Sequence, residues 1–261
     1  MNTRRPSVLL LVATLSAVAC TTAVATHVEP APPPAPAAAF SPSPTVEPDP
    51  AEPGPVLPRG TFVARSRTPN LTIWRGPSTS SGRRWSFPSR NAVGQPLSFL
   101  ITTAARDKTG DAWLRILLPI RPNEAAGWVR EDDVAVRRVD QRIVVDLSDR
   151  SLRYFRDGQL VDRFVVGIGR PETPTATGTF YIWAQVPQAS ASGPYGVFAL
   201  GLSGFSQVLK DWPGGGRMAI HGTANAGDRG QMVSHGCVRV FNGDMLDLKR
   251  VPLGTPVIIK T

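Results

Sequence analysis

Short hydrophobic runs, separated by turns rich in glycine, proline and asparagine, characterise the chain from residue 59 to residue 261. Such runs, several of them alternating in polarity, are typical of β-strands and are too short for most helices. Asn242–Leu248 is the one stretch whose pattern predicts a helix, with Asn242 as a candidate N-cap. The sequence therefore predicts a mostly β protein with two successive folded parts, residues 59–138 and 139–261.

The first 58 residues differ in composition from both folded parts. Arginines, an apolar segment and then Ala17-Val18-Ala19 form the pattern of a signal peptide over residues 1–19. Cys20 follows directly and resembles the lipid acceptor of a bacterial lipoprotein, the alternative being secretion without a lipid. Residues 20–58 are rich in proline and alanine and have little apolar mass, so they are expected to form an extended tether.

Positive charge is concentrated in the first folded part. Residues 59–138 contain 14 Lys and Arg against 6 Asp and Glu, whereas residues 139–261 contain 13 against 10. A basic domain outside the cell favours an anionic polymer partner, such as a wall polymer, and the alternative is a basic surface that only promotes solubility. The arginines are scattered and no nucleic-acid-binding motif occurs, so nucleic acid is not expected as a partner.

Two segments of the first part, Trp113-Leu114-Arg115-Ile116 and Gly127-Trp128-Val129, resemble strands of bacterial SH3-like wall domains. The resemblance implies a small β-barrel over residues 59–138. The tryptophans of this part are expected to belong to its core rather than to a ligand platform; they are Trp74, Trp85, Trp113 and Trp128.

The second folded part combines predicted strands with one long irregular segment. Residues 187–217 are rich in glycine and are expected to form a loop, and long loops in compact domains are usually functional. We expect strands at residues 142–147, 151–156, 159–168, 178–185, 218–220 and 257–260.

The segment from His221 to Asn242 contains one cysteine and two histidines. Because Cys20 stands at the end of the predicted export signal, Cys237 is the one unpaired cysteine of the folded parts. An exported protein keeps this free thiol in surroundings that oxidise thiols, which indicates a use for it. His221 and His235, 16 and 2 positions earlier, could take the thiol proton if the fold brings them together.

The residues around Cys237 fit acyl transfer. Ser234-His235-Gly236-Cys237 is a tight turn, and the N–H groups of Gly236 and Cys237 can stabilise a carbonyl oxygen that becomes negative. Arg239 can screen that charge or bind a substrate carboxylate. Two alternatives are an inert structural role and a zinc site, although His235-x-Cys237 spacing suits a closed zinc site poorly and no fourth ligand is evident.

His221-Gly222-Thr223, followed by Ser234-His235-Gly236-Cys237-Val238-Arg239 and Asn242, resembles the signature of the L,D-transpeptidase catalytic domain family. Members of this family are bacterial enzymes that cross-link peptidoglycan. The resemblance covers about residues 140–260 and implies a β-sandwich of mixed sheets. Four further segments support it: residues 144–147, 167–169, 173–180 and 199–202.

This resemblance also implies roles for individual residues. Cys237 would be the nucleophile, and His221 its base, oriented by the backbone carbonyl of Gly222. His235 would shape the pocket, and the N–H groups of Gly236 and Cys237 would form the oxyanion hole. The expected substrate-binding residues are Arg239, Tyr195, Ser203, Ser234 and Asn242.

The implied reaction joins two peptidoglycan stem peptides. Cys237 would attack a diaminopimelate carbonyl of a donor tetrapeptide and release D-alanine, and an acceptor amine would then take the acyl group in a 3→3 cross-link. The resemblance implies no metal or cofactor, and inhibition by β-lactams of the carbapenem type. We expect an exported protein, attached by a lipid on Cys20 to the outer face of the cytoplasmic membrane and facing the wall.

Rival functions share much of this pattern. Water instead of an amine would make the protein an L,D-carboxypeptidase, and a protein lysine would make it an anchoring enzyme. A cysteine endopeptidase would cleave stem peptides, and a non-catalytic wall-binding lipoprotein would only hold polymer. The pair of His221 and Cys237 argues against the last of these.

Overall fold

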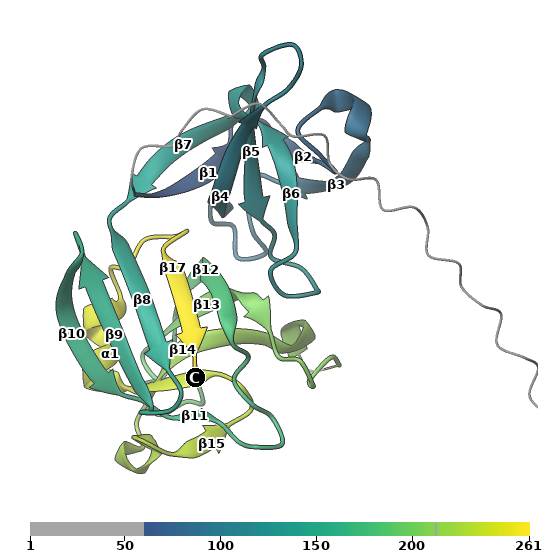
Figure 1. The fold of residues 1–261 in the computed structure, drawn as a ribbon. Coiled ribbons are helices and arrows are strands. Elements are labelled where there is room, and N and C mark those ends of the chain that lie inside the picture. The colour runs from purple at the N-terminus through teal and green to yellow at the C-terminus, as the bar shows by residue number, and fades with distance from the viewer. Residues whose placement is uncertain (1–59, 212) are drawn as a thin grey trace, which may run out of the picture. The chain divides into compact units, whose positions relative to one another are not determined.

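The computed structural model describes residues 60–211 and 213–261 (Figure 1). The predicted signal peptide (residues 1–19), Cys20 and the predicted tether (residues 20–58) lie outside the described residues. Among the residues described, no helix has the length and apolar character needed to cross a bilayer. The prediction of a mostly β protein is confirmed, because two large sheets account for most of the described chain.

The first folded part is a seven-stranded sheet with the strand order β3-β2-β6-β5-β4-β1-β7. Its interior is apolar because alternate residues of these strands point inward, as Leu71 and Ile73 do on β2 and Leu114 and Ile116 on β5. The strands are β1 (Thr61–Ser66), β2 (Asn70–Trp74), β3 (Arg83–Pro88), β4 (Ser98–Arg106), β5 (Ala112–Leu117), β6 (Ala126–Arg130) and β7 (Val134–Val139).

Of the four tryptophans expected in the core of this sheet, Trp113 is fully buried and the other three are half-buried. The guanidinium of Arg83 lies 5.6 Å from the Trp74 ring centroid, and that of Arg84 lies 4.0 Å from the Trp85 ring centroid. The likeness of this sheet to SH3-like domains stays a prediction.

The second folded part is an eight-stranded mixed sheet with the order β10-β9-β8-β17-β12-β13-β14-β16, and β11 pairs with β15 beside it. Helix α1 (Asn242–Leu248) buries Met245 and Leu248 in the same apolar core. The strands are β8 (Gln141–Asp146), β9 (Ser151–Arg156), β10 (Gln159–Val165), β11 (Ile168–Gly169), β12 (Gly178–Pro187), β13 (Phe198–Phe205), β14 (Arg217–Thr223), β15 (Met232–Ser234), β16 (Val238–Phe241) and β17 (Pro256–Lys260). Four short 3-10 helices are η1 (Thr79–Ser81), η2 (Glu131–Asp133), η3 (Pro213–Gly216) and η4 (Ala226–Asp228).

The expectation of one continuous loop over residues 187–217 is wrong, because β13 occupies its middle. This strand lacks polar alternation, since most of its residues are buried, and glycines interrupt its apolar pattern. Gly204 is required by packing: a Cβ there would lie 2.3 Å from the ring of Phe180. The glycines that suggested a loop therefore include one that lets two strands approach closely.

A further correction concerns the expected strand over residues 159–168. It ends at Val165, and Ile168–Gly169 pairs in a separate two-stranded ladder with β15. Gly167 causes the change of direction by exchanging backbone hydrogen bonds with Arg239, at 2.8 and 2.9 Å. A Cβ on Gly167 would lie 2.7 Å from the carbonyl oxygen of Asp228, so only glycine fits there.

Strands β14 and β16 set the positions of the predicted catalytic residues. They pair in parallel, with Ile220 opposite Val238 and His221 opposite Arg239. Cys237 directly precedes β16, and residues two apart on a strand share a face, as do residues opposite one another. His221, Arg239 and Cys237 are therefore placed on the same face of this ladder.

Candidate active site

Cys237 is a free cysteine that directly precedes β16. The residue as a whole is partly exposed, whereas its thiol group is largely buried. Burial of the thiol raises its pKa, while a hydrogen bond with the Ala219 backbone and the positive charge of Arg239 act in the opposite direction. The net result is a thiol that is protonated at neutral pH and needs a base in order to attack.

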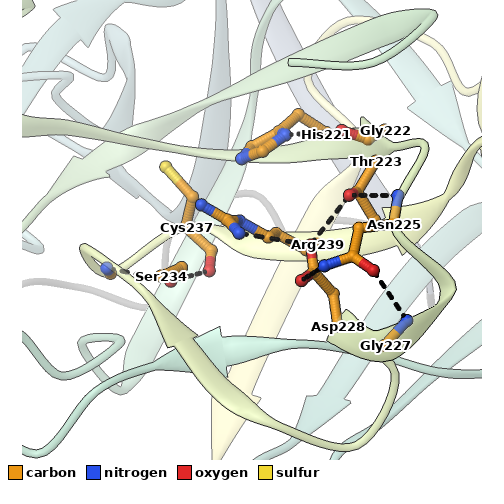
Figure 2. Close-up of polar contacts among 10 residues, drawn as sticks. His221, Gly222, Thr223, Asn225, Gly227, Asp228, Ser234, Cys237 and Arg239 are labelled. Carbon is orange, nitrogen blue, oxygen red and sulfur yellow. Dashed lines mark hydrogen bonds and ion pairs between the residues drawn. The ribbon is translucent and has the colours of Figure 1, made fainter. Parts of the chain in front are cut away.

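His221 is the residue that can act as this base. Its side chain is buried, and its Nδ1 lies 2.9 Å from the carbonyl oxygen of Gly222. Because a carbonyl oxygen only accepts, Nδ1 carries the proton and Nε2 keeps its lone pair. Figure 2 shows the imidazole directed toward the sulfur of Cys237.

Burial also decides the protonation state of His221. It lowers the pKa of His221 to about 4, and the nearby charge of Arg239 acts in the same direction. The hydrogen bond to Gly222 and the charge of Asp228 oppose this shift without cancelling it. At neutral pH the site therefore contains a neutral imidazole and a neutral thiol, and the proton moves when the thiol attacks.

The turn before Cys237 is fixed by its own polar groups. Ser234 Oγ donates to the carbonyl oxygen of Cys237 at 2.5 Å and accepts from the N–H of Gly236 at 3.1 Å. The left-handed φ of Gly236, 110°, is one that glycine adopts without strain. His235, between them, is exposed.

This arrangement differs from the predicted oxyanion hole. The N–H of Gly236 was expected to point at a substrate oxygen, but the hydroxyl of Ser234 accepts it instead. Ser234, expected to contact substrate, uses its hydroxyl within the turn. The N–H of Cys237 remains the predicted oxyanion donor.

Arg239 is held beside the sulfur by a buried carboxylate that we did not predict from the sequence. Asp228 Oδ2 lies 3.1 Å from Arg239 Nη1 and accepts from Thr223 Oγ1 at 2.8 Å, while Oδ1 accepts from Asn225 Nδ2 at 2.9 Å (Figure 2). The side chain of Asp228 is 6 % exposed, so the ion pair is shielded from solvent. Arg239 therefore contributes a fixed positive charge to the site.

The residue pattern agrees with that of known proteins. Residues 140–259 match the family model described as the YkuD L,D-transpeptidase catalytic domain. The YkuD protein of Bacillus licheniformis is 37 % identical over 122 residues, which are 46 % of this chain and 66 % of that relative. The YkuD protein of Bacillus subtilis is 30 % identical over 150 residues, which are 55 % of this chain and 84 % of that relative.

The chain belongs to the L,D-transpeptidase catalytic domain family. Among solved structures, the catalytic domain of the Enterococcus faecium L,D-transpeptidase acylated by ertapenem is 26 % identical, with a TM-score of 0.36. That match covers 48 % of this chain and 99 % of the solved domain. The matched family region includes the whole eight-stranded sheet up to Ile259 and leaves out the first sheet.

The remaining residues expected to bind substrate occupy different places in the L,D-transpeptidase domain. Tyr195 lies against His221, with ring centroids 5.1 Å apart in an edge-to-face arrangement, and is 44 % exposed. Ser203 is buried within β13, where its hydroxyl accepts from the N–H of Tyr181 at 3.1 Å. The structure thus brings Tyr195 to His221, while the hydroxyl of Ser203 is used inside the sheet.

Asn242 does not act as the helix N-cap that was expected. Phe241 is the N-cap residue of α1, and Asn242 is the first residue of the helix. The carboxamide of Asn242 instead binds two backbone groups of the loop that carries Tyr195. The side chain of Asn242, which the local sequence suggested as a helix cap, therefore makes a tertiary contact with this loop.

Within residues 60–211 and 213–261, no group of three or more His, Cys, Asp or Glu side chains is arranged to hold a metal ion. The hydrogen bond of His221 to the Gly222 carbonyl uses one of the two imidazole nitrogens that a metal could bind.

Asp228→Asn is expected to lower the free energy of unfolding of the transpeptidase domain by about 1–3 kcal/mol, because it removes a buried charge partner and turns one acceptor into a donor. Asp244→Asn is the matched control, since its pair with Arg229 joins side chains that are 30 % and 43 % exposed. The control should change stability by less than about 1 kcal/mol. Equal effects in denaturant unfolding would contradict a special role for Asp228.

Proposed function

We propose that this chain is a peptidoglycan L,D-transpeptidase that forms 3→3 cross-links through a thioester on Cys237. The observation that carries the proposal is that the free cysteine Cys237 lies beside a buried imidazole whose Nδ1 is held by the Gly222 carbonyl (Figure 2). This leaves a basic nitrogen directed at the sulfur, which is the requirement for nucleophilic catalysis by cysteine.

In the acylation step, His221 Nε2 takes the thiol proton while Sγ attacks the diaminopimelate carbonyl that is bonded to the terminal D-alanine of a donor tetrapeptide. The C–N bond to D-alanine then breaks, and His221 returns the proton to the departing amine. A thioester between Cys237 and the donor tripeptide remains, and His221 is neutral again.

In the second step, the side-chain amine of a diaminopimelate in an acceptor stem attacks the thioester. The new amide forms as the bond to Sγ breaks, and the proton lost by the amine passes through His221 to the sulfur. Both steps need a neutral imidazole at the start, which the lowered pKa of His221 supports.

The negative oxygen that develops in both steps needs a donor and a positive field. The N–H of Cys237 is the donor we assign, because the N–H of Gly236 is already donated to Ser234. Arg239, fixed by Asp228, supplies a positive charge close to the sulfur without having to move during the reaction.

We extend the proposal to inhibitors and location. The catalytic domain of the Enterococcus faecium L,D-transpeptidase is acylated by ertapenem, which supports acylation of Cys237 by carbapenems in this chain. Export and a lipid anchor on Cys20 remain part of the proposal.

We also propose that the first sheet binds an anionic wall polymer, because Arg83 and Arg84 lie over tryptophan rings there. If residues 139–261 alone bound sacculi as tightly as residues 59–261, the polymer-binding role would be wrong.

The test is to incubate the purified chain with a disaccharide-tetrapeptide that contains diaminopimelate, and to identify the products by mass spectrometry. A dimer that has lost one D-alanine is the expected product. Tripeptide as the sole product would favour the L,D-carboxypeptidase. Cleavage of a supplied cross-linked dimer would favour an endopeptidase. Unchanged substrate with no adduct on Cys237 would favour the non-catalytic wall-binding protein.

A further inference from the structure

The loop between β12 and β13 covers the catalytic histidine. Its residue Tyr195 packs edge-on against His221, with an interplanar angle of 76° and ring centroids 5.1 Å apart. Tyr195 is 44 % exposed whereas His221 is 3 % exposed, so the tyrosine ring lies on the solvent side of the imidazole. Removing this ring would expose His221 to water.

One side chain fastens this loop to the strands of the catalytic pair. Asn242 Oδ1 accepts from the N–H of Val197 at 3.0 Å, and Asn242 Nδ2 donates to the carbonyl oxygen of Ala191 at 2.8 Å. The two bonds enclose Tyr195 between their attachment points. Asn242 itself follows directly on β16, the strand that begins after Cys237.

The loop, Asn242 and Gly222 are too closely packed to admit a side chain at Gly196 or Gly222. Gly196 has a φ of 61°, and a Cβ there would lie 2.2 Å from Asn242 Oδ1 and 2.3 Å from the carbonyl carbon of Gly222. A Cβ on Gly222 would lie 2.4 Å from the same Oδ1. The loop therefore packs against the peptide whose carbonyl orients His221, and two glycines allow that approach.

We propose that Asn242 is a positioning residue that holds the 188–197 loop closed, so that Tyr195 excludes water from the imidazole of His221. The inference depends on the proposed function only for the role of His221 as the base. The attachment of the loop over His221 by the carboxamide of Asn242 does not depend on which substrate the protein uses.

Other neighbouring groups also influence the pKa of His221, so a test of the loop requires variants that leave these groups unchanged. The charged groups near its imidazole are Arg239 and Asp228, with the thiol of Cys237 and the phenol of Tyr195 beside it. Asp228 is bound by Thr223, Asn225 and Arg239, so truncating Asn242 leaves those hydrogen bonds intact. A change in the titration of His221 would then report on the loop.

The experiment is an NMR titration of the imidazoles in the full chain, carried out without substrate on the original protein and on Asn242→Ala and Tyr195→Ala. We expect each variant to raise the protonation constant of His221 by at least about tenfold, which is about one pKa unit toward the value of a hydrated histidine. The double variant should show little more than either single one, because both act through the same ring.

The controls separate shielding from a general loss of structure. Tyr195→Phe keeps the ring, and Leu246→Ala lies at an exposed position of the same helix, so both should leave the titration of His221 unchanged. If Asn242→Ala does not fold, Tyr195→Ala decides, and an unchanged His221 titration in a folded variant overturns the proposal. Failure to form cross-links would refute the proposed function and leave this result standing.

Discussion

Cys237→Ala is expected to eliminate acylation of the protein by a carbapenem and by a tetrapeptide donor. Cys237 is the one cysteine among the residues that the structure describes, so the reaction should fall to the rate of the uncatalysed background. Intact-protein mass spectrometry should show an adduct of one acyl group on the original chain and none on the variant. Since Cys237 is partly exposed, its truncation should leave the cooperative unfolding transition in place.

The chain offers a matched control for this result. Cys20→Ala removes the other cysteine and should leave acylation by the soluble carbapenem unchanged, because Cys20 lies directly after the predicted signal peptide and outside the two predicted folded parts. An adduct that persists in Cys237→Ala and disappears in Cys20→Ala would mean that Cys20 is the acylated thiol. It would contradict the proposed mechanism at its first step.

His221→Gln should slow acylation of Cys237 by about 10²- to 10⁴-fold, the usual contribution of a positioned general base. The pH dependence should change as well. In the original chain the base loses its lone pair only as the pH falls through about 4, so acylation should vary little between pH 5 and pH 7. In the variant only thiolate formed without assistance reacts, and the rate should rise about tenfold per pH unit over that range.

Stopped-flow or quenched acylation with a carbapenem across this pH range would check both parts. His27→Gln is the matched control, since His27 lies in the predicted tether and should not alter the rate. A loss of activity centred near pH 6.5 in the original chain would mean that His221 is hydrated and charged more easily than its burial implies. A His221→Gln variant with an unchanged rate would exclude the histidine as the base.

The sequence predicted the features that depend on local pattern. The helix at Asn242–Leu248 and most strand positions follow from periodicity and turn residues. The motif that contains His221 and Cys237 predicts the catalytic pair, and that assignment stays a prediction. β13 was missed because its buried, glycine-interrupted sequence carries no alternation. An alternating pattern predicts a strand with one exposed face, and almost all residues of β13 are buried.

The site residues that were misjudged depend on contacts between distant segments. Asn242 is a good N-cap by type, but the backbone of the 188–197 loop competes for its carboxamide. Asp228 lies in a short connection with no motif of its own, and only the fold shows that it faces Arg239. One signal was present: Asn225 three residues before Asp228 is typical of a turn stabilised by side chains, which can present a carboxylate inward.

The parallel pairing of β14 with β16 means that the spacing of base and nucleophile is specified by a ladder of backbone hydrogen bonds and not by the length of chain that joins them. The connection over residues 224–231 could therefore gain or lose residues at its exposed positions while the catalytic pair kept its geometry, provided that Asp228 still reached Arg239. A shift of the ladder by one residue would instead turn His221 to the opposite face of the sheet. The proposed reaction thus depends on strand register: we expect it to tolerate insertions between β14 and β16 and not to tolerate a shift of the two strands along one another.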